Sequence, residues 1–514
     1  MPGETLLPFL SVSLSTLNSL ISIFPPLSFS FPSFSRSKNP KSPEMGLKQA
    51  LTDPNMDPKK RRRVAFPSID VGVEANECIK IFLVSCKEEV GVEGSFQIDP
   101  VDLNQFFDED GKIFGYKNLK INIFLSTISF HAYADVTFES SSDGGKGITD
   151  LKPALQKILG ESLVVEKEEF LQTFSSGVDY IRNVISNGEV LRREAAKGDN
   201  NKSNNQLEPE SFTVEHQVIR MAVNSMSVGE LYCRLVPLVL LLVDGSSPID
   251  VTDPRWEIYL AVESKSNDQG VVGIKLLGFA AVYRFYYYPD SSRLRISQVL
   301  VLPPYQGQGH GRLLLEVLNS VALSENVYDV TVEEPSDHLQ HVRTIVDMHR
   351  LLDFEPIKQA IISVALHLKQ GNLPKKPSKL QSDPPATAVE DVRRSLKINK
   401  KQFLQCWEIL IYLELDHSDS NCMENYRTLI TDRTRNDILG KDTGVAEKQL
   451  IEVPNDYDHE MTFVMFCPSD NVKMDKINAE VEGNQVTREE QLKQLVDERM
   501  KEIMEIAQKI SLNR

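Results

Sequence analysis

A run of glycines between an apolar segment and an amphipathic segment most constrains how this 514-residue chain can fold. Residues 294–302 are apolar and β-branched, which predicts a buried strand that ends at the Pro-Pro pair 303–304. The sequence Gln-Gly-Gln-Gly-His-Gly follows at 306–311, and residues 311–323 have the periodicity of an amphipathic helix. Such a unit gathers backbone N–H groups and the positive end of a helix dipole, which suits a pyrophosphate.

Three phosphate-binding motifs share this arrangement. A P-loop would end in Gly-Lys-Ser/Thr, but Arg312 follows the last glycine. A dinucleotide-binding fold needs GxGxxG and an acid about twenty residues on; Glu333 supplies the acid, but the glycine spacing is GxGxG and a meander precedes it. The pattern Gln306-x-x-Gly309-x-Gly311 resembles the Gln/Arg-x-x-Gly-x-Gly/Ala signature of the GNAT superfamily of N-acetyltransferases.

Four blocks make this resemblance more specific. Residues 295–311, the Phe-Gly-Tyr-Lys block 114–117, the Asp-Pro-Arg-Trp block 253–256 and the Val-Glu-Glu-Pro-Ser block 332–336 resemble the catalytic subunit of the type B histone acetyltransferases. The similarity extends over residues 74–370. It implies an enzyme that transfers acetyl groups from acetyl-CoA to lysines in the N-terminal tail of newly synthesised histone H4. It also implies a WD-repeat histone chaperone of the retinoblastoma-binding type as partner.

The resemblance assigns one set of residues to acetyl-CoA. Backbone N–H groups at the strand end would hold the pantetheine, the glycine loop would bind the phosphates, and two residues further on would contact the far side of the co-substrate. In that order, the residues are Val299, Leu300, Val301, Gln306, Gly307, Gln308, Gly309, His310, Gly311, Arg312, Ser336 and His338. For His338, an ordinary place on a helix face is an equally good interpretation.

Amine attack on a thioester requires a base, because a lysine ammonium with a pKa of about 10.4 is not nucleophilic. The resemblance places the principal catalytic carboxylate at Glu333, after a strand predicted over 327–332, and two others at Glu334 and Asp244. Asp244 stands where the family has Glu and is one methylene shorter. The alternative is that the Glu-Glu-Pro sequence is a solvated strand end. No cysteine lies near the loop, so we expect direct transfer in a ternary complex.

The resemblance further implies a surface for a basic peptide. An acidic loop would meet the histone tail from one side, and a strand before the glycine unit from the other. The residues are Asp108, Glu109 and Asp110 in the loop, and Tyr283, Arg284 and Phe285 in the strand. Gly111 stands where an acid is expected, and an arginine is unusual on such a surface. For the tyrosines at 286–288 we expect core packing rather than peptide contact.

Together these elements predict an α/β (α+β) protein with the GNAT N-acetyltransferase fold, whose sheet is mixed and mostly antiparallel. The predicted divisions are a disordered extension 1–73, a small α+β N-terminal histone acetyltransferase domain 74–194, a flexible loop 195–211, an acetyl-CoA-binding domain 212–370, a linker 371–386 and a helical C-terminal region 387–514. The closing helix, predicted over 488–510, would bind a partner or pack in a bundle.

Composition and the N-terminal segment limit the other possibilities. The six cysteines stand singly and no zinc-ligand spacing occurs, so we expect no metal. A net charge of −16 suits a basic partner rather than direct nucleic-acid binding, and no membrane contact is expected. Residues 58–64, Pro-Lys-Lys-Arg-Arg-Arg-Val, resemble a nuclear import signal, so we expect the nucleus and the cytoplasm. The charge-free segment 5–35 weakly resembles a plastid transit peptide, and translation from Met45 or Met56 would omit it.

Two alternatives stay open at this point. The first is an acetyltransferase of the same superfamily that acts on another amine. The second is a non-catalytic histone-binding or chaperone module on an acetyltransferase scaffold. The glycine loop and Glu333 are both intact, which favours an enzyme over the second alternative.

Overall fold

The computed structural model describes residues 71–92, 95–101, 103–107, 111–195, 213–267, 270–370, 383–438 and 478–512. Residues 67–514 form one compact unit. Most of the predicted extension, flexible loop and linker therefore lies outside the described residues, as does the basic segment 58–64. Within the described ranges, none of the helices has the length and apolar character needed to cross a membrane.

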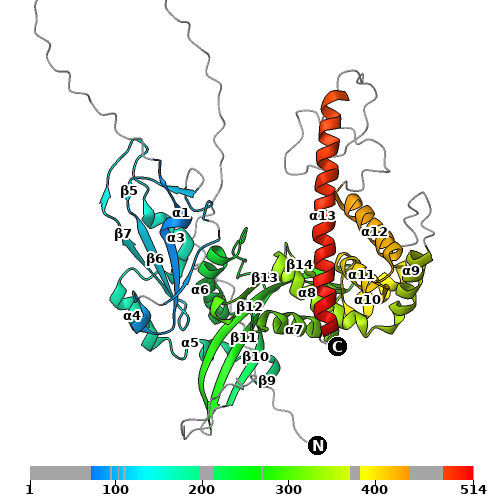
Figure 1. Ribbon diagram of the computed structural model, residues 1–514. Helices are drawn as coiled ribbons and strands as arrows, with labels where there is room; N and C mark the ends of the chain where they lie inside the picture. Colours follow the sequence, from blue (N-terminus) through cyan, green and yellow to red (C-terminus); the bar gives the residue numbers. More distant parts are fainter. Residues whose placement is uncertain are drawn as a thin grey trace, which may run out of the picture. The chain divides into compact units, whose positions relative to one another are not determined.

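The largest sheet has six strands in the order β14-β13-β12-β11-β10-β9 (Figure 1). Its strands are β9 (Glu189–Ala195), β10 (Thr213–Ala222), β11 (Trp256–Asn267), β12 (Gly270–Tyr287), β13 (Ser291–Val301) and β14 (Val330–Val332). Neighbours are antiparallel except for β13 and β14, which are parallel. This confirms the mixed, mostly antiparallel sheet. The predicted N-terminal domain ended at residue 194 and so included most of β9, but β9 pairs with β10 and belongs to this sheet.

Alternating side chains of the sheet enter two different cores. On β11, Ile258 and Leu260 pack in the core that includes α6, whereas Tyr259 and Ala261 pack in the core that includes α7. The two helices are α6 (Met226–Leu242) and α7 (His310–Ser324). Both faces of the sheet are thus covered, and residues one position apart on a strand serve different cores.

The N-terminal part is built on a second sheet, with the order β3-β2-β6-β7. Its elements are β1 (Val73–Glu74), α1 (Ala75–Cys78), β2 (Ile79–Val84), β3 (Phe96–Ile98), β4 (Lys112–Ile113), β5 (Tyr116–Lys117), β6 (Lys120–Ser126), β7 (Ala132–Thr137), β8 (Ser140–Ser141), α3 (Leu151–Leu159), α4 (Lys167–Ser176) and α5 (Tyr180–Ile185). Ile81 and Ile123 of this sheet belong to the same buried cluster as Leu235 of α6 and Phe279 of β12. The N-terminal part and the six-stranded sheet therefore share one core.

The helical C-terminal region is confirmed, but its bundle also includes residues 337–370, which were predicted in the acetyl-CoA-binding domain. Its helices are α8 (Asp337–Leu352), α9 (Lys358–Gln370), α10 (Ala386–Leu396), α11 (Lys400–Glu414), α12 (Ser420–Ile438) and α13 (Asn478–Leu512). Helix α13 buries Val496, Met500 and Ile503 in a cluster with Trp407 of α11 and Tyr426 of α12. The closing helix is therefore a bundle helix, the second of the two possibilities left open by the sequence.

Strands β13 and β14 pair over only three positions, from Leu294 with Val330 to Ile296 with Val332. The N–H of Glu333 makes one further bond, of 2.9 Å, to the carbonyl oxygen of Ile296. Beyond it the backbone turns at Glu334, whose φ of 35° is positive, and β13 continues to its end without pairing to β14. We call residues 297–301 of β13 the open edge.

A β-bulge begins the open edge. Opposite β12, Val282 pairs with Ile296 but Ala281 pairs with Gln298, so Ser297 is an extra residue. The extra residue reverses the alternation of β13: Ile296 packs in the α7 core, whereas Gln298 contacts Tyr232 of α6. The bulge therefore lies where the pairing with β14 ends.

Gly278 provides a test of how closely β12 and β13 approach. A Cβ atom there would lie 2.6 Å from the carbonyl oxygen of Leu300 and 2.8 Å from the Cα of Val301. Because backbone must move to make room, we expect Gly278→Ala to lower the free energy of unfolding by about 1–3 kcal/mol in urea denaturation. Gly273→Ala, in the same strand but with open space around it, is the control and should change it by less than about 0.5 kcal/mol. Equal losses would contradict the close approach.

Candidate acetyl-transfer site

The glycine loop depends on two left-handed residues. Gly307 has a φ of 75° and Gly309 a φ of 91°, a region that side chains other than glycine rarely adopt. The side-chain amides on either side hold the loop to the strand end: Gln306 Nε2 donates to the Val301 carbonyl at 3.0 Å, and Gln308 Nε2 to the Pro304 carbonyl at 3.3 Å. The two glutamines therefore fix the loop to the strand end, and the two glycines allow its backbone to turn.

The loop presents a row of backbone donors. Among the described residues, the N–H groups of residues 307–312 have no hydrogen-bond partner, and the first partnered one is that of Leu313, which bonds to Gly309. Gly309 is the N-cap of α7, so the first turn of that helix adds its unpaired donors and the positive end of its dipole. This arrangement fits a diphosphate group.

The open edge offers donors as well, but not at all three predicted positions. The Leu302 N–H bonds to Leu277 on β12, and N–H groups alternate in direction along a strand. The N–H groups of Val299 and Val301 therefore point away from β12, to the side that β14 leaves unpaired, while that of Leu300 points to β12. Leu300 instead buries its side chain in the α6 core.

His310 is the first residue of α7, and its side chain turns inward. It is 3% exposed and its ring makes an edge-on contact with that of His216, with the centroids 4.9 Å apart. His216 Nε2 in turn lies 3.7 Å from a carboxylate oxygen of Glu263. Only the backbone N–H of His310, not its imidazole, is available to a ligand on the loop.

The other residues predicted to contact the co-substrate have separate positions. Arg312 is half-exposed and pairs with Glu316 one turn later, at 2.6 Å. Ser336 is the N-cap of α8 and accepts a hydrogen bond from the Leu339 N–H at 3.3 Å. His338, in the first turn of α8, is exposed. The Ser336 hydroxyl thus already has a structural role.

Glu333 lies at the start of the open edge, and two residues of β13 hold its carboxylate. Ser297 Oγ donates to one oxygen at 2.7 Å, and Arg295 Nη1 lies 3.4 Å from the other. The Glu333 side chain is 46% exposed, so solvent can exchange protons with it. The bulge residue Ser297 therefore orients the carboxylate at the place where the strands part.

Two further predicted carboxylates are not held in this way. Glu334 is exposed at the positive-φ turn after Glu333. Asp244 is exposed in the loop after α6, and no hydrogen bond or ion pair joins it to Glu333 among the described residues. That loop is nevertheless tied to the open edge, because Gln298 Nε2 donates to the Ser247 carbonyl at 2.8 Å.

An aromatic wall adjoins Glu333. Tyr283 makes edge-on contacts with Trp256 and Phe285, with ring centroids 4.8 and 4.5 Å apart. The guanidinium of Arg295 lies over the Phe285 ring at 4.9 Å, which connects the wall to the arginine that contacts Glu333. We call Trp256, Tyr283 and Phe285 the aromatic wall.

A carboxylate borders the aromatic wall. The Tyr283 hydroxyl donates to Asp253 Oδ2 at 3.0 Å. The Arg255 guanidinium beside Asp253 holds the pKa of that carboxyl below its usual range, so it is ionised. The wall therefore combines aromatic faces with a negative charge.

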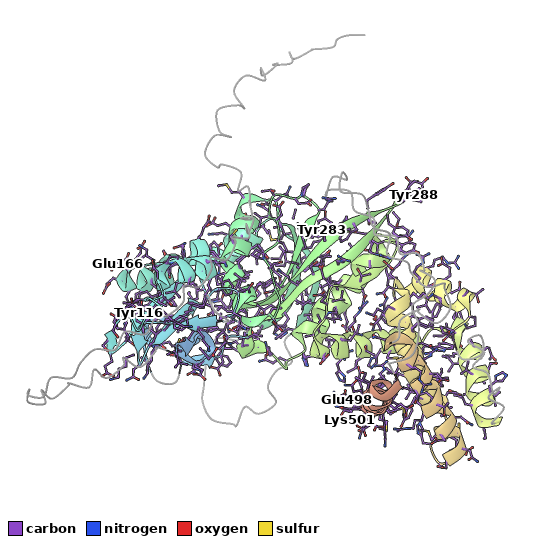
Figure 2. The ribbon with its side chains drawn as sticks, turned by 90° about the horizontal axis from the view of Figure 1, so that it is seen from above. Tyr116, Glu166, Tyr283, Tyr288, Glu498 and Lys501 are labelled. Carbon is purple, nitrogen blue, oxygen red and sulfur yellow. The ribbon has the colours of Figure 1, made fainter. Side chains whose placement is uncertain are left out.

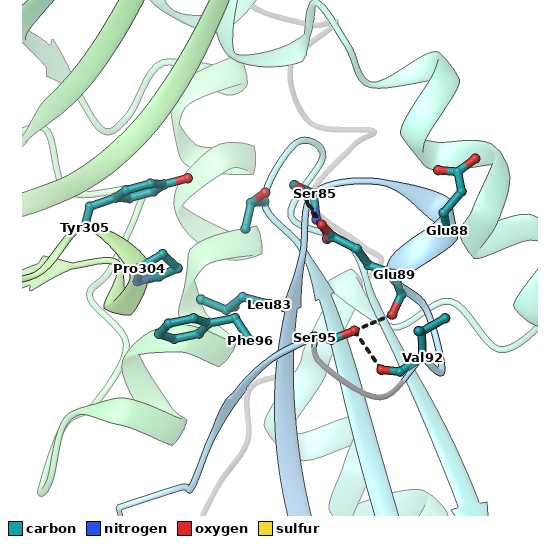
Figure 3. A pocket seen from close by; sticks show the side chains of 10 residues that line it. Leu83, Ser85, Glu88, Glu89, Val92, Ser95, Phe96, Pro304 and Tyr305 are labelled. Carbon is teal, nitrogen blue, oxygen red and sulfur yellow. Dashed lines mark hydrogen bonds between the residues drawn. The ribbon is translucent and has the colours of Figure 1, made fainter. Parts of the chain in front are cut away.

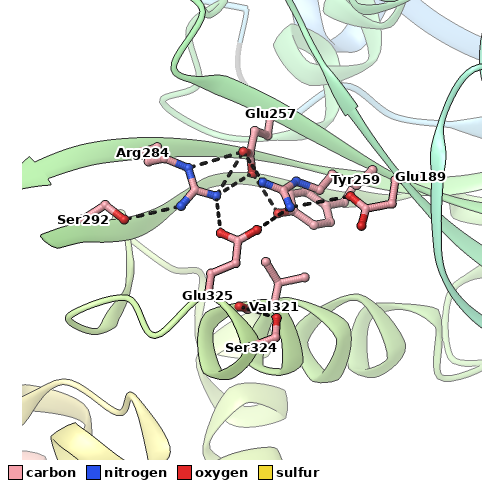
Figure 4. A network of polar contacts seen from close by, with 9 residues as sticks. Glu189, Glu257, Tyr259, Arg284, Ser292, Val321, Ser324 and Glu325 are labelled. Carbon is pink, nitrogen blue, oxygen red and sulfur yellow. Dashed lines mark hydrogen bonds and ion pairs between the residues drawn. The ribbon is translucent and has the colours of Figure 1, made fainter. Parts of the chain in front are cut away.

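Arg284 does not line this wall. Because side chains alternate along β12, Arg284 points to the opposite face, where it bonds to Glu257 at 3.0 Å and to Glu325 at the end of α7 at 2.7 Å (Figure 4). Burial raises the pKa of Glu257, but the guanidinium groups of Arg220 and Arg284 outweigh it and lower the pKa below its usual value. Arg284 therefore belongs to an ion network that joins the sheet to α7, and the prediction that it lines the peptide surface is wrong.

The tyrosines at 286–288 also differ from expectation. Tyr286 and Tyr288 are 70% and 81% exposed, so core packing is wrong for these two. Only Tyr287 is packed, stacked on Tyr328 with the ring centroids 3.7 Å apart. Tyr288 lies at the end of the long strands, well away from Tyr283 (Figure 2). The residues lie at a hairpin tip, where Tyr286 and Tyr288 meet solvent and Tyr287 packs on Tyr328.

The acidic loop residues Asp108, Glu109 and Asp110 lie outside the described residues. Within the described ranges, no cluster of three or more His, Cys, Asp or Glu side chains is arranged to hold a metal ion. A cavity of about 500 Å³ lies between Pro304–Tyr305 and the loop around Glu88 and Phe96 (Figure 3). None of the predicted site residues lines it.

Sequence reasoning missed three residues that shape this site. Ser297, Arg295 and Gln298 lie within the strand that was predicted as a uniform apolar segment. The run Arg-Ile-Ser-Gln places polar residues at 295, 297 and 298, which breaks strict alternation in an otherwise apolar strand. That break was the available signal for a bulge.

Comparisons with known proteins agree with this geometry. Residues 71–244 match the family described as "Histone acetyl transferase HAT1 N-terminus", and residues 250–342 match "Acetyltransferase (GNAT) family". The chain is 53% identical over 463 residues to an Arabidopsis thaliana protein named histone acetyltransferase type B catalytic subunit, covering 90% of this chain and 97% of that protein. A Zea mays protein of the same name is 49% identical over 471 residues, with 91% and 97% covered. One from Dictyostelium discoideum is 26% identical over 359 residues, with 68% and 66% covered.

The buried His310 makes stability depend on pH. Burial and the neighbouring His216 lower the pKa of His310 below its usual value near 6.5, against a weaker raising effect of Glu263. The unfolded chain therefore binds more protons just below that pH, and stability falls as the solution is acidified. We expect the melting temperature to fall less in His310→Gln than in wild type when the pH is lowered from about 7.5 to 5.5. The exposed control His338→Gln should follow wild type; identical slopes for all three proteins would contradict the prediction.

Proposed function

The chain belongs to the histone acetyltransferase type B catalytic subunits, and we propose that it acetylates lysines in the N-terminal tail of newly synthesised histone H4 by direct transfer in a ternary complex. The observation that carries the proposal is the parting of β13 and β14 beside Glu333. It places a carboxylate, an unpaired strand edge and a glycine loop along one path. These three features would serve acetyl transfer as the proton acceptor, the site of the pantetheine arm and the site of the diphosphate.

Acetyl-CoA is the co-substrate of GNAT acetyltransferases, and the chain's donors suit its parts. The N–H groups of residues 307–312 would bind the diphosphate, with Arg312 free to move from Glu316 toward negative charge. The N–H groups of Val299 and Val301 would bind the amide oxygens of pantetheine and polarise the thioester carbonyl. Donors fixed in advance stabilise the oxyanion of the tetrahedral intermediate without reorganising during the reaction.

Glu333 would act as the general base. It takes a proton from the lysine ammonium, directly or through water, and the free amine attacks the carbonyl carbon of the thioester. The C–S bond then breaks and the thiolate of coenzyme A leaves. The attacking nitrogen loses its second proton as it becomes an amide, and one proton is taken up by the thiolate, directly or through water. Ser297 and Arg295 hold the carboxylate where the strands part, so the proton acceptor and the polarising N–H groups meet at one place.

The aromatic wall suits a basic peptide. Aromatic faces attract cations, and the ionised Asp253 adds a negative charge beside Tyr283. The overall charge of −16 would attract a histone tail over longer distances. We propose that Asp108, Glu109 and Asp110 contact the histone tail from the side opposite to the aromatic wall.

The resemblance further supports two proposals about context. We infer that a WD-repeat histone chaperone of the retinoblastoma-binding type is the partner that presents the histone. We also infer that the protein works in both nucleus and cytoplasm, because residues 58–64 have the composition of an import signal. Newly made histones are basic proteins that must pass from one compartment to the other, which is consistent with such a distribution.

The role of Glu333 is tested by acetyl transfer from labelled acetyl-CoA to an H4 tail peptide. We expect Glu333→Gln to lower kcat by about 10²–10⁴-fold, the usual contribution of a general base, with KM for acetyl-CoA unchanged. Glu355→Gln, which removes the same charge from an exposed carboxylate that pairs with Lys358 at the start of α9, should match wild type. A kcat equal to wild type would remove Glu333 from the mechanism.

The wild-type arm of this assay separates the alternatives. Transfer to the H4 tail peptide supports the proposed substrate. Transfer only to other amines would show an acetyltransferase of different specificity. Peptide binding without any transfer would show a histone-binding module that retains the acetyltransferase scaffold.

A further inference from the structure

The strand that carries Glu333 has a second neighbour, far along the chain. Strand β14 is only three residues long, and on the edge away from β13 its first residue, Val330, pairs in parallel with Ile398. The Val330 N–H bonds to the carbonyl oxygen of Lys397 at 2.9 Å. Ile398 lies in the connection between α10 and α11, so the C-terminal helical region completes the pairing of β14.

Asn399 uses both ends of its side-chain amide at this junction. Its Nδ2 donates to the Val330 carbonyl oxygen at 2.9 Å, and its Oδ1 accepts from the Gln402 N–H at 3.0 Å as the N-cap of α11. Arg343 of α8 also reaches the Val330 carbonyl, at 3.3 Å. The Asn399 side chain therefore joins the start of α11 to β14, the strand that leads to Glu333.

The connection that carries Asn399 is itself firmly held. Lys397 is buried with a φ of 58°, and its Nζ donates to Asn326 Oδ1, at 2.6 Å, in the turn before β14. Arg350 of α8 donates to the Leu396 carbonyl oxygen. Helix α11 then buries Phe403 and Trp407 in the bundle core. A bundle packed in this way provides a rigid support for a three-residue strand that could not hold its own position.

We propose that Asn399 is a positioning residue for the acetyl-transfer reaction: by holding the Val330 carbonyl, it fixes β14 and thereby the carboxylate of Glu333 at the open edge. Val330 precedes Glu333 by three residues, a span of roughly 10 Å along a strand, so a small rotation at Val330 displaces the carboxylate. The inference rests on the proposed role of Glu333. It gives the helical C-terminal region a part in catalysis that needs no contact with either substrate.

Asn399→Ser tests the donor without removing the helix cap. Serine is as good an N-cap as asparagine, but its hydroxyl is too short to serve α11 and the Val330 carbonyl together. We expect kcat to fall about tenfold, because displacing a catalytic group by about 1 Å can lower the rate by up to a hundredfold. KM for acetyl-CoA should not change, because Asn399 contacts neither the glycine loop nor the open edge. Asn399→Asp keeps the cap and replaces the donor by a carboxylate oxygen, so it should also lower kcat. This variant replaces the serine variant in the experiment if the latter does not fold.

A matched control separates positioning from stability. Asp419 accepts from the N–H groups of Asn421 and Cys422 at the start of α12, in the same bundle, and does not contact β14. Asp419→Ala should lower the melting temperature of the protein and leave kcat unchanged. If Asn399→Ser also lowers only the melting temperature, Asn399 is merely structural and the inference is overturned.

The double variant shows whether Asn399 acts through Glu333. In the Glu333→Gln background, Asn399→Ser should have no further effect on kcat, because the group that it positions is gone. A further tenfold loss would overturn the inference and leave the proposed function intact. A Glu333→Gln protein with wild-type kcat would instead overturn the proposed function, so the two failures are distinguishable.

Discussion

The whole site depends on a hydrogen-bonding pattern that stops. Strands β13 and β14 pair from Leu294–Val330 to Ile296–Val332, and the residues after these positions do not pair with each other. A parallel pair that continued would satisfy the Val299 and Val301 N–H groups within the sheet and would leave no space for a co-substrate arm. Because it ends, donors that a sheet normally uses for itself become available to a ligand.

Several separate features keep the strands apart. Ser297 forms the bulge and orients Glu333, while the next residue, Gln298, is buried between the Tyr232 hydroxyl and the Ser247 carbonyl. On the far side, the bundle holds β14 through Val330. The open edge is thus fixed from the α6 core and from the C-terminal helices, two parts of the chain separated by more than a hundred residues. A binding slot with rigid walls costs less to order when a substrate enters.

The sequence predicts this fold well where the signals are local. The Pro-Pro exit, the glycine loop and the periodicity of 311–323 are confirmed by β13 and α7. Predictions of side-chain direction were weaker, because they depend on the register of neighbouring strands. Arg284 lies on the opposite face of the sheet from Tyr283, because side chains alternate along a strand. The His310 side chain points inward, because it packs against His216 of β10. The support of β14 by Asn399 joins residues sixty-nine positions apart and leaves no local signal.

The proposed acetyl-CoA site consists of backbone donors along the open edge and the glycine loop. Amide hydrogen exchange with and without acetyl-CoA tests this site directly, since both segments carry N–H groups without a hydrogen-bond partner among the described residues. We predict that acetyl-CoA slows exchange at Val299, at Val301 and across residues 307–312. Unchanged exchange in these segments, with protection instead around the cavity beside Glu88 and Phe96, would contradict the account.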